Sequence, residues 1–236
     1  MDNKDTTSPI SLRRARAQDL PALADVAAQA MLEDELFDYI CPYRYEYHSD
    51  YRREILDRLR PRFVKPGFMI VVAVEDEGTT SELIRGYALW QRIGSLSSSF
   101  ESPMEIGNAS LEKEIQDTRA ADYPPDRSVD PDRLEHYKAS VRDCFPYDEY
   151  PELLWLETLA VDPKYQRRGI GRRLVQWGML LSQLEKVPIG LEAGIQGSAL
   201  YETLGFQTLN TLELIPGIPM RAMLYDNVGT DVSQHP

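Results

Sequence analysis

The sequence predicts an α/β fold, a mixed central sheet of about seven strands flanked by helices. The first supporting observation is the order of elements. Apolar runs of strand length, bounded by Pro, Gly and Asp, alternate with segments whose apolar residues recur at helical spacing. The second is length, because 236 residues can bury a substantial core as one domain. We therefore treat residues 1–236 as a single domain with loose polar tails at 1–9 and 227–236.

Punctuating residues separate the expected elements of the N-terminal half. Asp19 and Pro21 mark the start of a helix, and Pro61 marks the end of another. The expected elements are a strand at 10–14, a helix from 19, a helix at 50–59, and a hairpin of strands 68–74 and 83–93 joined by a turn at 75–81.

A long insertion, residues 94–150, separates the third and fourth strands and exceeds ordinary loop length. Its pattern predicts helices at 108–120 and 131–145. Long inserts serve both as functional lids and as surface decoration, and both readings stay open here. The expected elements after it are a strand at 153–161, a helix from 170, a strand at 187–193, a helix at 198–204, a strand after 206 and a strand at 218–225.

Composition excludes several classes of partner. The formal net charge of −12 argues against a nucleic-acid or anionic-membrane surface. The start of the chain has no apolar signal region, and no apolar run approaches membrane-spanning length. Cys41 and Cys144 form no Cys-x-x-Cys pair, and the three histidines have no zinc-like spacing. We expect a soluble cytoplasmic protein without a metal.

The chemistry centres on the hexapeptide Gln-Arg-Arg-Gly-Ile-Gly at 166–171, which joins a strand to the start of a helix. The first N–H groups of a helix have no intrahelical partner and carry partial positive charge. Glycines let a phosphate approach the backbone, and Arg167, Arg168 and Arg172 can add charge-assisted contacts. The segment is therefore suited to hold an anion.

Two segments carry a resemblance to a known family. The hexapeptide, preceded by Leu-Ala-Val-Asp-Pro-Lys-Tyr, strongly resembles motif A (Gln/Arg-x-x-Gly-x-Gly/Ala) of the GCN5-related N-acetyltransferases, the GNAT family. The segment Ala-Leu-Tyr-Glu-Thr-Leu-Gly-Phe at 199–206 looks like its motif B. The pair covers about a quarter of the chain, and motif pairs at this spacing are specific.

The resemblance implies a fold, a co-substrate and a set of site residues. It implies a GNAT-like sheet whose fourth and fifth strands splay apart to admit acetyl-CoA. It assigns the Leu159 N–H as oxyanion donor and Tyr201 as the general acid near the thioester sulfur. It also implies that the acidic and aromatic segment 33–48 helps to form the acceptor pocket. The expected cofactor-binding residues are Leu159, Ala160, Val161, Gln166, Arg167, Arg168, Gly169, Ile170, Gly171, Arg172, Ser198 and Tyr201.

The general base has two candidates. Glu157 lies two residues before Leu159, so without a bulge both side chains face the same side of the strand. Glu192 lies within the apolar fifth strand, where some family members place their base. Partial burial would raise the pKa of either carboxyl group. We favour Glu157 slightly, and a water chain could replace both. One departure is that Gln196-Gly197-Ser198 stands where many members carry an Asn; Ser198 could take over that contact.

These features predict an acetyl-CoA-dependent N-acetyltransferase that transfers the acetyl group directly to a small-molecule amine in a ternary complex. A protein N-terminal or lysine acetyltransferase is an alternative, although the aromatic cluster and the insertion suggest a closed pocket. A non-catalytic acyl-CoA-binding module is another, which would keep the glycine loop but lose the acid. Tyr201 favours an enzyme.

Overall fold

The computed structural model describes residues 10–76, 82–95, 113, 124–215 and 217–226. The strands are β1 (Ile10–Arg14), β2 (Phe68–Asp76), β3 (Glu82–Ile93), β4 (Leu153–Val161), β5 (Ile189–Ala193), β6 (Gln207–Ile215) and β7 (Ile218–Tyr225). The helices of eight or more residues are α1 (Leu20–Ala30), α3 (His48–Val64), α5 (Pro131–Val141), α6 (Ile170–Glu185) and α7 (Ile195–Glu202). A shorter helix, α2 (Glu35–Ile40), follows α1.

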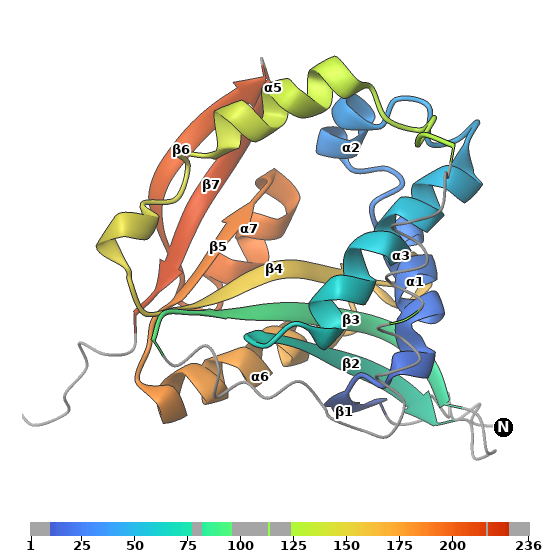
Figure 1. Cartoon of the computed structure of the whole chain (residues 1–236). Helices are drawn as coiled ribbons and strands as arrows, with labels where there is room; N and C mark the ends of the chain where they lie inside the picture. Colours follow the sequence, from blue (N-terminus) through green and yellow to red (C-terminus); the bar gives the residue numbers. More distant parts are fainter. Residues whose placement is uncertain (1–9, 77–81, 96–112, 114–123, 216, 227–236) are drawn as a thin grey trace, which may run out of the picture.

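The strands form one seven-stranded sheet in the order β1-β2-β3-β4-β5-β7-β6. Every neighbouring pair is antiparallel except β4 and β5, which run parallel. The parallel pair is joined by α6, the crossover helix that such a pair requires. The predicted mixed α/β sheet is confirmed (Figure 1).

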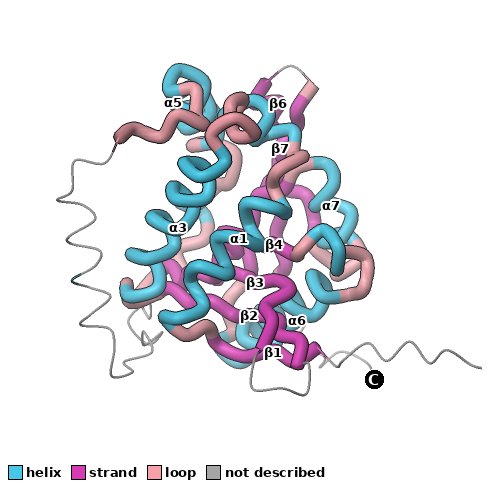
Figure 2. The backbone as a smooth tube through the Cα atoms, turned by 90° about the vertical axis from the view of Figure 1, so that its right-hand side faces the viewer, coloured by secondary structure: helices cyan, strands magenta, loops and turns pink. Residues whose placement is uncertain are grey.

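Helices cover both faces of this sheet, as Figures 1 and 2 show. One core lies between the sheet and α1 and α3. A second core lies between the opposite face and α6 and α7. A third packs the segment after α5 against β4 and β7 through Phe145, Trp155 and Ala222. Apolar residues of β2 alternate between the first two cores, which explains its continuous apolar run.

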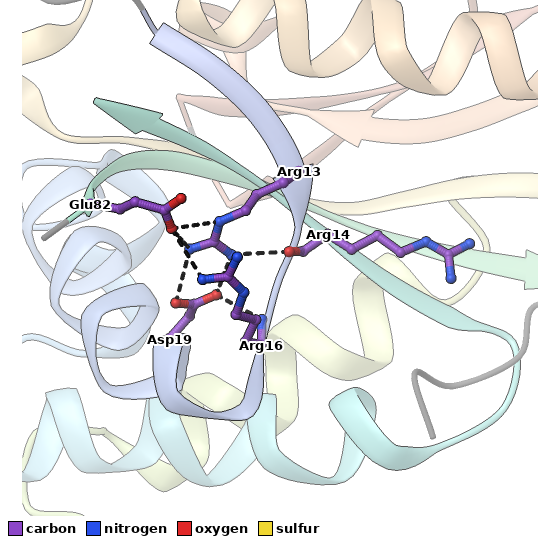
Figure 3. A network of polar contacts seen from close by, with 5 residues as sticks. All are labelled: Arg13, Arg14, Arg16, Asp19 and Glu82. Atoms are coloured by element: carbon purple, nitrogen blue, oxygen red, sulfur yellow. Dashed lines mark hydrogen bonds and ion pairs between the residues drawn. The ribbon is translucent and has the colours of Figure 1, made fainter. Parts of the chain in front are cut away.

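The predicted helix start at Asp19 is built from a polar network (Figure 3). The Asp19 carboxylate accepts hydrogen bonds from the Arg16 N–H at 2.7 Å and from Arg13 Nη1 at 2.7 Å. Arg13 Nε also donates to Glu82 at 2.8 Å. The network therefore fixes the turn from β1 into α1 against the first residue of β3.

Three expected helices differ from the structure or lie outside it. The helix predicted at 50–59 runs over His48–Val64, so the prediction that it ends before Pro61 was wrong. Pro61 removes one helical hydrogen bond, but the extra turn buries Phe63 in the core and the Lys65 N–H donates to Pro61 O. The insertion helix predicted at 131–145 is α5, and the one at 108–120 falls almost wholly outside the described residues.

Within the described residues, no helix combines the length and the apolar character needed to cross a membrane.

Candidate active site

The central feature of the site is the separation of β4 from β5. The two strands pair only at Leu154–Ile189, Trp155–Gly190 and Leu156–Leu191. Beyond Leu156, β4 continues to Val161 without a β5 partner. The splay that the family resemblance implied is therefore present, and it leaves one edge of β4 open.

The open edge of β4 exposes backbone groups of alternate residues. The Asp162 N–H donates to Arg85 O at 2.9 Å, so the backbone polar groups of Asp162 point toward β3. Because these groups alternate along a strand, those of Ala160 point toward β3 as well. Leu159 and Val161 then direct their N–H and C=O groups toward β5. Val161 O accepts a hydrogen bond from Gln166 Nε2 at 3.2 Å. By the same alternation, the Leu159 N–H points toward the open edge.

A β-bulge lies at Glu157, opposite the Leu89–Trp90 step of β3. Leu89 pairs with Thr158 and Trp90 with Leu156, so Glu157 is the extra residue. As a result, Leu159 packs toward α6, whereas the Glu157 carboxylate contacts Arg62 of α3 on the other face. The expectation that Glu157 and Leu159 share a face was wrong, because it assumed a regular strand.

The predicted anion-binding loop runs from the end of β4 into the N-terminus of α6. Arg167 and Gly169 both adopt positive φ, at 61° and 80°. The first helical bond runs from the Arg173 N–H to Gly169 O. Among the described residues, the N–H groups of Gly169, Ile170 and Gly171 donate no hydrogen bond, as expected at a helix start. The loop therefore presents a row of free donors.

This helix start lies directly beside the open edge of β4. A Cβ atom placed on Gly171 would lie 3.7 Å from Leu159 and 3.8 Å from Val161. The Arg168 guanidinium lies 4.8 Å from the Tyr165 ring, and Arg172 Nη2 donates to Thr203 Oγ1 at 2.7 Å. One elongated ligand could therefore contact the cationic loop and the strand edge together.

α7 carries the predicted acid and one predicted cofactor contact. The Tyr201 side chain is buried, and its ring packs edge-on against Phe206 at 5.5 Å between centroids. Burial raises the pKa of the Tyr201 hydroxyl, which keeps it protonated. The Ser198 hydroxyl donates to Ile195 O at 2.9 Å and accepts from Arg221 Nη1 at 3.0 Å. Ser198 is thus already engaged, and Arg221 is a neighbour that sequence reasoning missed.

The two carboxylate candidates have different environments. Glu157 Oε1 lies 2.5 Å from Arg62 Nε; burial raises the pKa of Glu157, and Arg62 opposes that shift. Burial raises the pKa of Glu192 to about 7, opposed by the backbone N–H of Phe145. Within the described part of the chain, Glu192 forms no ion pair. Glu192 therefore combines partial burial, a near-neutral pKa and a carboxylate without a cationic partner.

A family model agrees with this arrangement. An acetyltransferase (GNAT) domain model matches residues 137–208, which include β4, the loop, α6, β5 and α7. The chain therefore carries a GNAT acetyltransferase domain, which is the domain of an acyltransferase.

Known acetyltransferases match this chain over most of its length. An acetyltransferase of Stachybotrys chartarum is 24% identical over 209 residues, covering 86% of this chain and 83% of the relative. A solved Corynebacterium glutamicum structure, of histone acetyltransferase HPA2 and related acetyltransferase, is 21% identical with a TM-score of 0.58, covering 92% of this chain and 96% of that chain. The polyamine N-acetyltransferase of Drosophila melanogaster is 14% identical with a TM-score of 0.55, covering 92% of this chain and 100% of that chain.

In this GNAT fold, the candidate acid on α7 and the candidate base on β5 lie on opposite faces of the sheet. Ala193 packs in the same core as Tyr201, on the α6 side. Glu192, the preceding residue, faces the segment after α5. Glu192 and Ala193 lie just beyond Leu191, the last β5 residue that pairs with β4. The strand separation thus has a tyrosine on one side and a carboxylate on the other.

Sequence reasoning missed the aromatic residues that precede β4. The Tyr147 ring lies 5.0 Å from the Trp155 ring, and the Phe145 ring lies 5.0 Å from it on an edge. Their spacing, with aromatic residues at 145, 147 and 150 just before a strand, was a signal that could have been read. By contrast, Tyr43 and Tyr45 of the predicted acceptor segment are 49% and 60% exposed.

Proposed function

We propose that this GNAT enzyme transfers the acetyl group of acetyl-CoA directly to the amine of a small molecule. The observation that carries the proposal is the open edge of β4, flanked by free helix N–H donors at one end and by Glu192 and Tyr201 at the other. This geometry can hold a long anionic thioester while an amine approaches from the opposite face.

The residues present fit acetyl-CoA. The pyrophosphate would lie against the N–H groups of residues 169–172, with Arg167 and Arg168 as cationic neighbours. The pantetheine amides would pair with the backbone groups of Leu159 and with the Val161 N–H, as another strand would. The acetyl carbonyl would then lie near the Leu159 N–H, which can donate to the oxyanion that develops on attack.

Direct transfer requires that the amine lose its proton, since an alkyl amine with a pKa near ~10 is mostly charged at neutral pH. Glu192 accepts that proton, and a carboxylate with a pKa of about 7 is well matched to this task. The neutral amine nitrogen bonds to the acetyl carbon, the carbon–sulfur bond breaks, and Tyr201 gives its proton to the departing thiolate. The nitrogen's second proton then passes to the Tyr201 phenolate, and Glu192 releases the first proton to solvent. Glu157 is less suited as the base because Arg62 already holds it. A water molecule that relays the amine proton to Glu192 gives the same net proton transfer.

The described part of the insertion supports a small acceptor. α5 contacts α2 at one end and β6 at the other, as Figure 1 shows. The Asp130 N–H donates to Ile40 O at 3.0 Å, and Asn210 donates to Cys144 O at 3.3 Å. α5 thus closes over the face that carries Glu192, where a protein substrate would need an open groove. The Drosophila relative is likewise named for small amines.

The test is an acetyl-CoA thiol-release screen against an amine library, with mass spectrometry of each amide product. We expect release of one CoA per acetylated amine, and loss of release in Glu192→Gln. A chain that binds CoA but releases none with any amine would instead be a binding module. Robust acetylation of peptides with no small-molecule turnover would favour a protein acceptor.

A further inference from the structure

The face of the sheet that carries Glu192 is lined with aromatic rings. Tyr137 of α5, together with Phe145, Tyr147 and Trp155, forms what we call the aromatic wall. Phe145 and Tyr147 are 5.1 Å apart between centroids, and each packs on Trp155. Burial raises the pKa of Tyr137 to about 12, and the nearby charge of Glu192 adds to this shift. The carboxylate is therefore surrounded by apolar and aromatic surface.

Two arginines of α3 form ion pairs on this face. Arg62 contacts Glu157 at 2.5 Å, with the side chains 31% and 23% exposed. Arg58, one turn earlier on α3, pairs with Glu54 at 3.3 Å. Among the residues that the structure describes, Glu192 has no cationic partner. The Glu192 carboxylate is thus open to pairing with an incoming cation.

The number of free carboxylates limits the charge that an acceptor can carry. The reacting amine gives up its proton to Glu192 and needs no permanent counter-ion. A second ammonium on the same molecule would stay charged while losing water, which is costly without a partner. Glu157 has the right charge and lies on this face, but its oxygen is already held by Arg62. An apolar or aromatic body would instead gain area and ring contacts against the aromatic wall.

We propose that the acceptor is a monoamine with an apolar body. Arg62 enforces this choice because its ion pair with Glu157 keeps that carboxylate from binding a second ammonium. The proposal rests on the proposed function and specifies its substrate class. Arg62 is a positioning residue here, since it acts through Glu157 and need not touch the acceptor. Removing its charge would free Glu157 to receive the distal ammonium of a diamine.

The test compares hexylamine with hexamethylenediamine, which share one chain and differ by the distal ammonium. We expect kcat/KM for hexylamine to exceed that for the diamine by at least about tenfold in the wild-type enzyme, mainly through KM. Arg62→Ala and Arg62→Gln should shrink the ratio several-fold by improving the diamine, which a merely structural defect would not do. Arg62→Lys should keep the wild-type preference because it retains the charge.

Arg52→Gln is the matched control, because Arg52 lies on the same helix but pairs with Asp25. Its ratio should equal that of the wild type. A wild-type preference for the diamine, or a ratio that no folded Arg62 variant changes, would overturn the proposal while leaving amine acetylation intact. Failure to acetylate any amine, with CoA bound, would overturn the proposed function itself.

Discussion

Replacing Glu192 by Gln should lower the activity of the enzyme while raising its stability at high pH. The substitution keeps the shape of the side chain but removes its ability to accept a proton. General bases contribute roughly 10²–10⁴-fold in rate, so kcat should fall within that range while acetyl-CoA binding is retained. In the wild type, kcat/KM should fall below a pH of about 7, where Glu192 becomes protonated. The variant should lack this acidic limb.

The same carboxylate should destabilise the folded protein at high pH. Burial raises the pKa of Glu192 from 4.5 to about 7, so the folded state keeps the proton longer than the unfolded state does. The stability that the neutral carboxyl contributes is complete below pH 4.5 and is lost as the pH rises through about 7. The shift corresponds to at most about 3 kcal/mol. Glu192→Gln should recover part of this free energy of unfolding at pH 8 and almost none near pH 4.5.

The assay is urea unfolding of the wild type and Glu192→Gln across this pH range, beside pH–rate profiles of both. Glu157→Gln is the control, since the same substitution there strips Arg62 of its partner and should lower stability. It should also leave the acidic limb in place. A Glu192→Gln enzyme with full kcat, or one whose stability difference from wild type does not change with pH, would refute the assignment of Glu192.

Three further substitutions test other parts of the site and core. Tyr201→Phe should lower kcat by roughly 10²–10⁴-fold with acetyl-CoA binding unchanged in calorimetry, because the thiolate loses its proton donor; a folded variant with full kcat would remove Tyr201 from the mechanism. Gly171→Glu should weaken acetyl-CoA binding by at least about tenfold, whereas Gly171→Ala, whose methyl group meets only ordinary contacts, should still fold; equal affinities in calorimetry would disprove the phosphate loop. Gly178→Ala should destabilise the protein by about 1–3 kcal/mol in urea unfolding, because its methyl group would clash with the buried Trp90 ring; an unchanged midpoint would contradict that packing.

Much of the fold could be predicted because the residues that end its elements are strong local signals. The fourth strand and the start of α6 follow from Asp162-Pro163 and the glycine pair, and both were predicted correctly. The extension of α3 past Pro61 could not be predicted, because it depends on the burial of Phe63 against β2. Tertiary packing overrode a local signal there.

The site was less predictable for the same physical reason. The bulge at Glu157 reverses the faces of the residues after it, and nothing in the local sequence marks it. The ion pair between Glu157 and Arg62 joins residues far apart in the chain. Which carboxylate is free therefore emerges only from the structure, and it moves our preference from Glu157 to Glu192.

The most direct test of acetyl transfer at the β4–β5 separation is two-substrate kinetics, with acetyl-CoA and an amine both varied. Direct transfer in a ternary complex predicts intersecting lines in double-reciprocal plots. It also predicts an unchanged intact protein mass after incubation with acetyl-CoA alone. Parallel lines, together with an enzyme whose mass has increased by one acetyl group, would contradict the account.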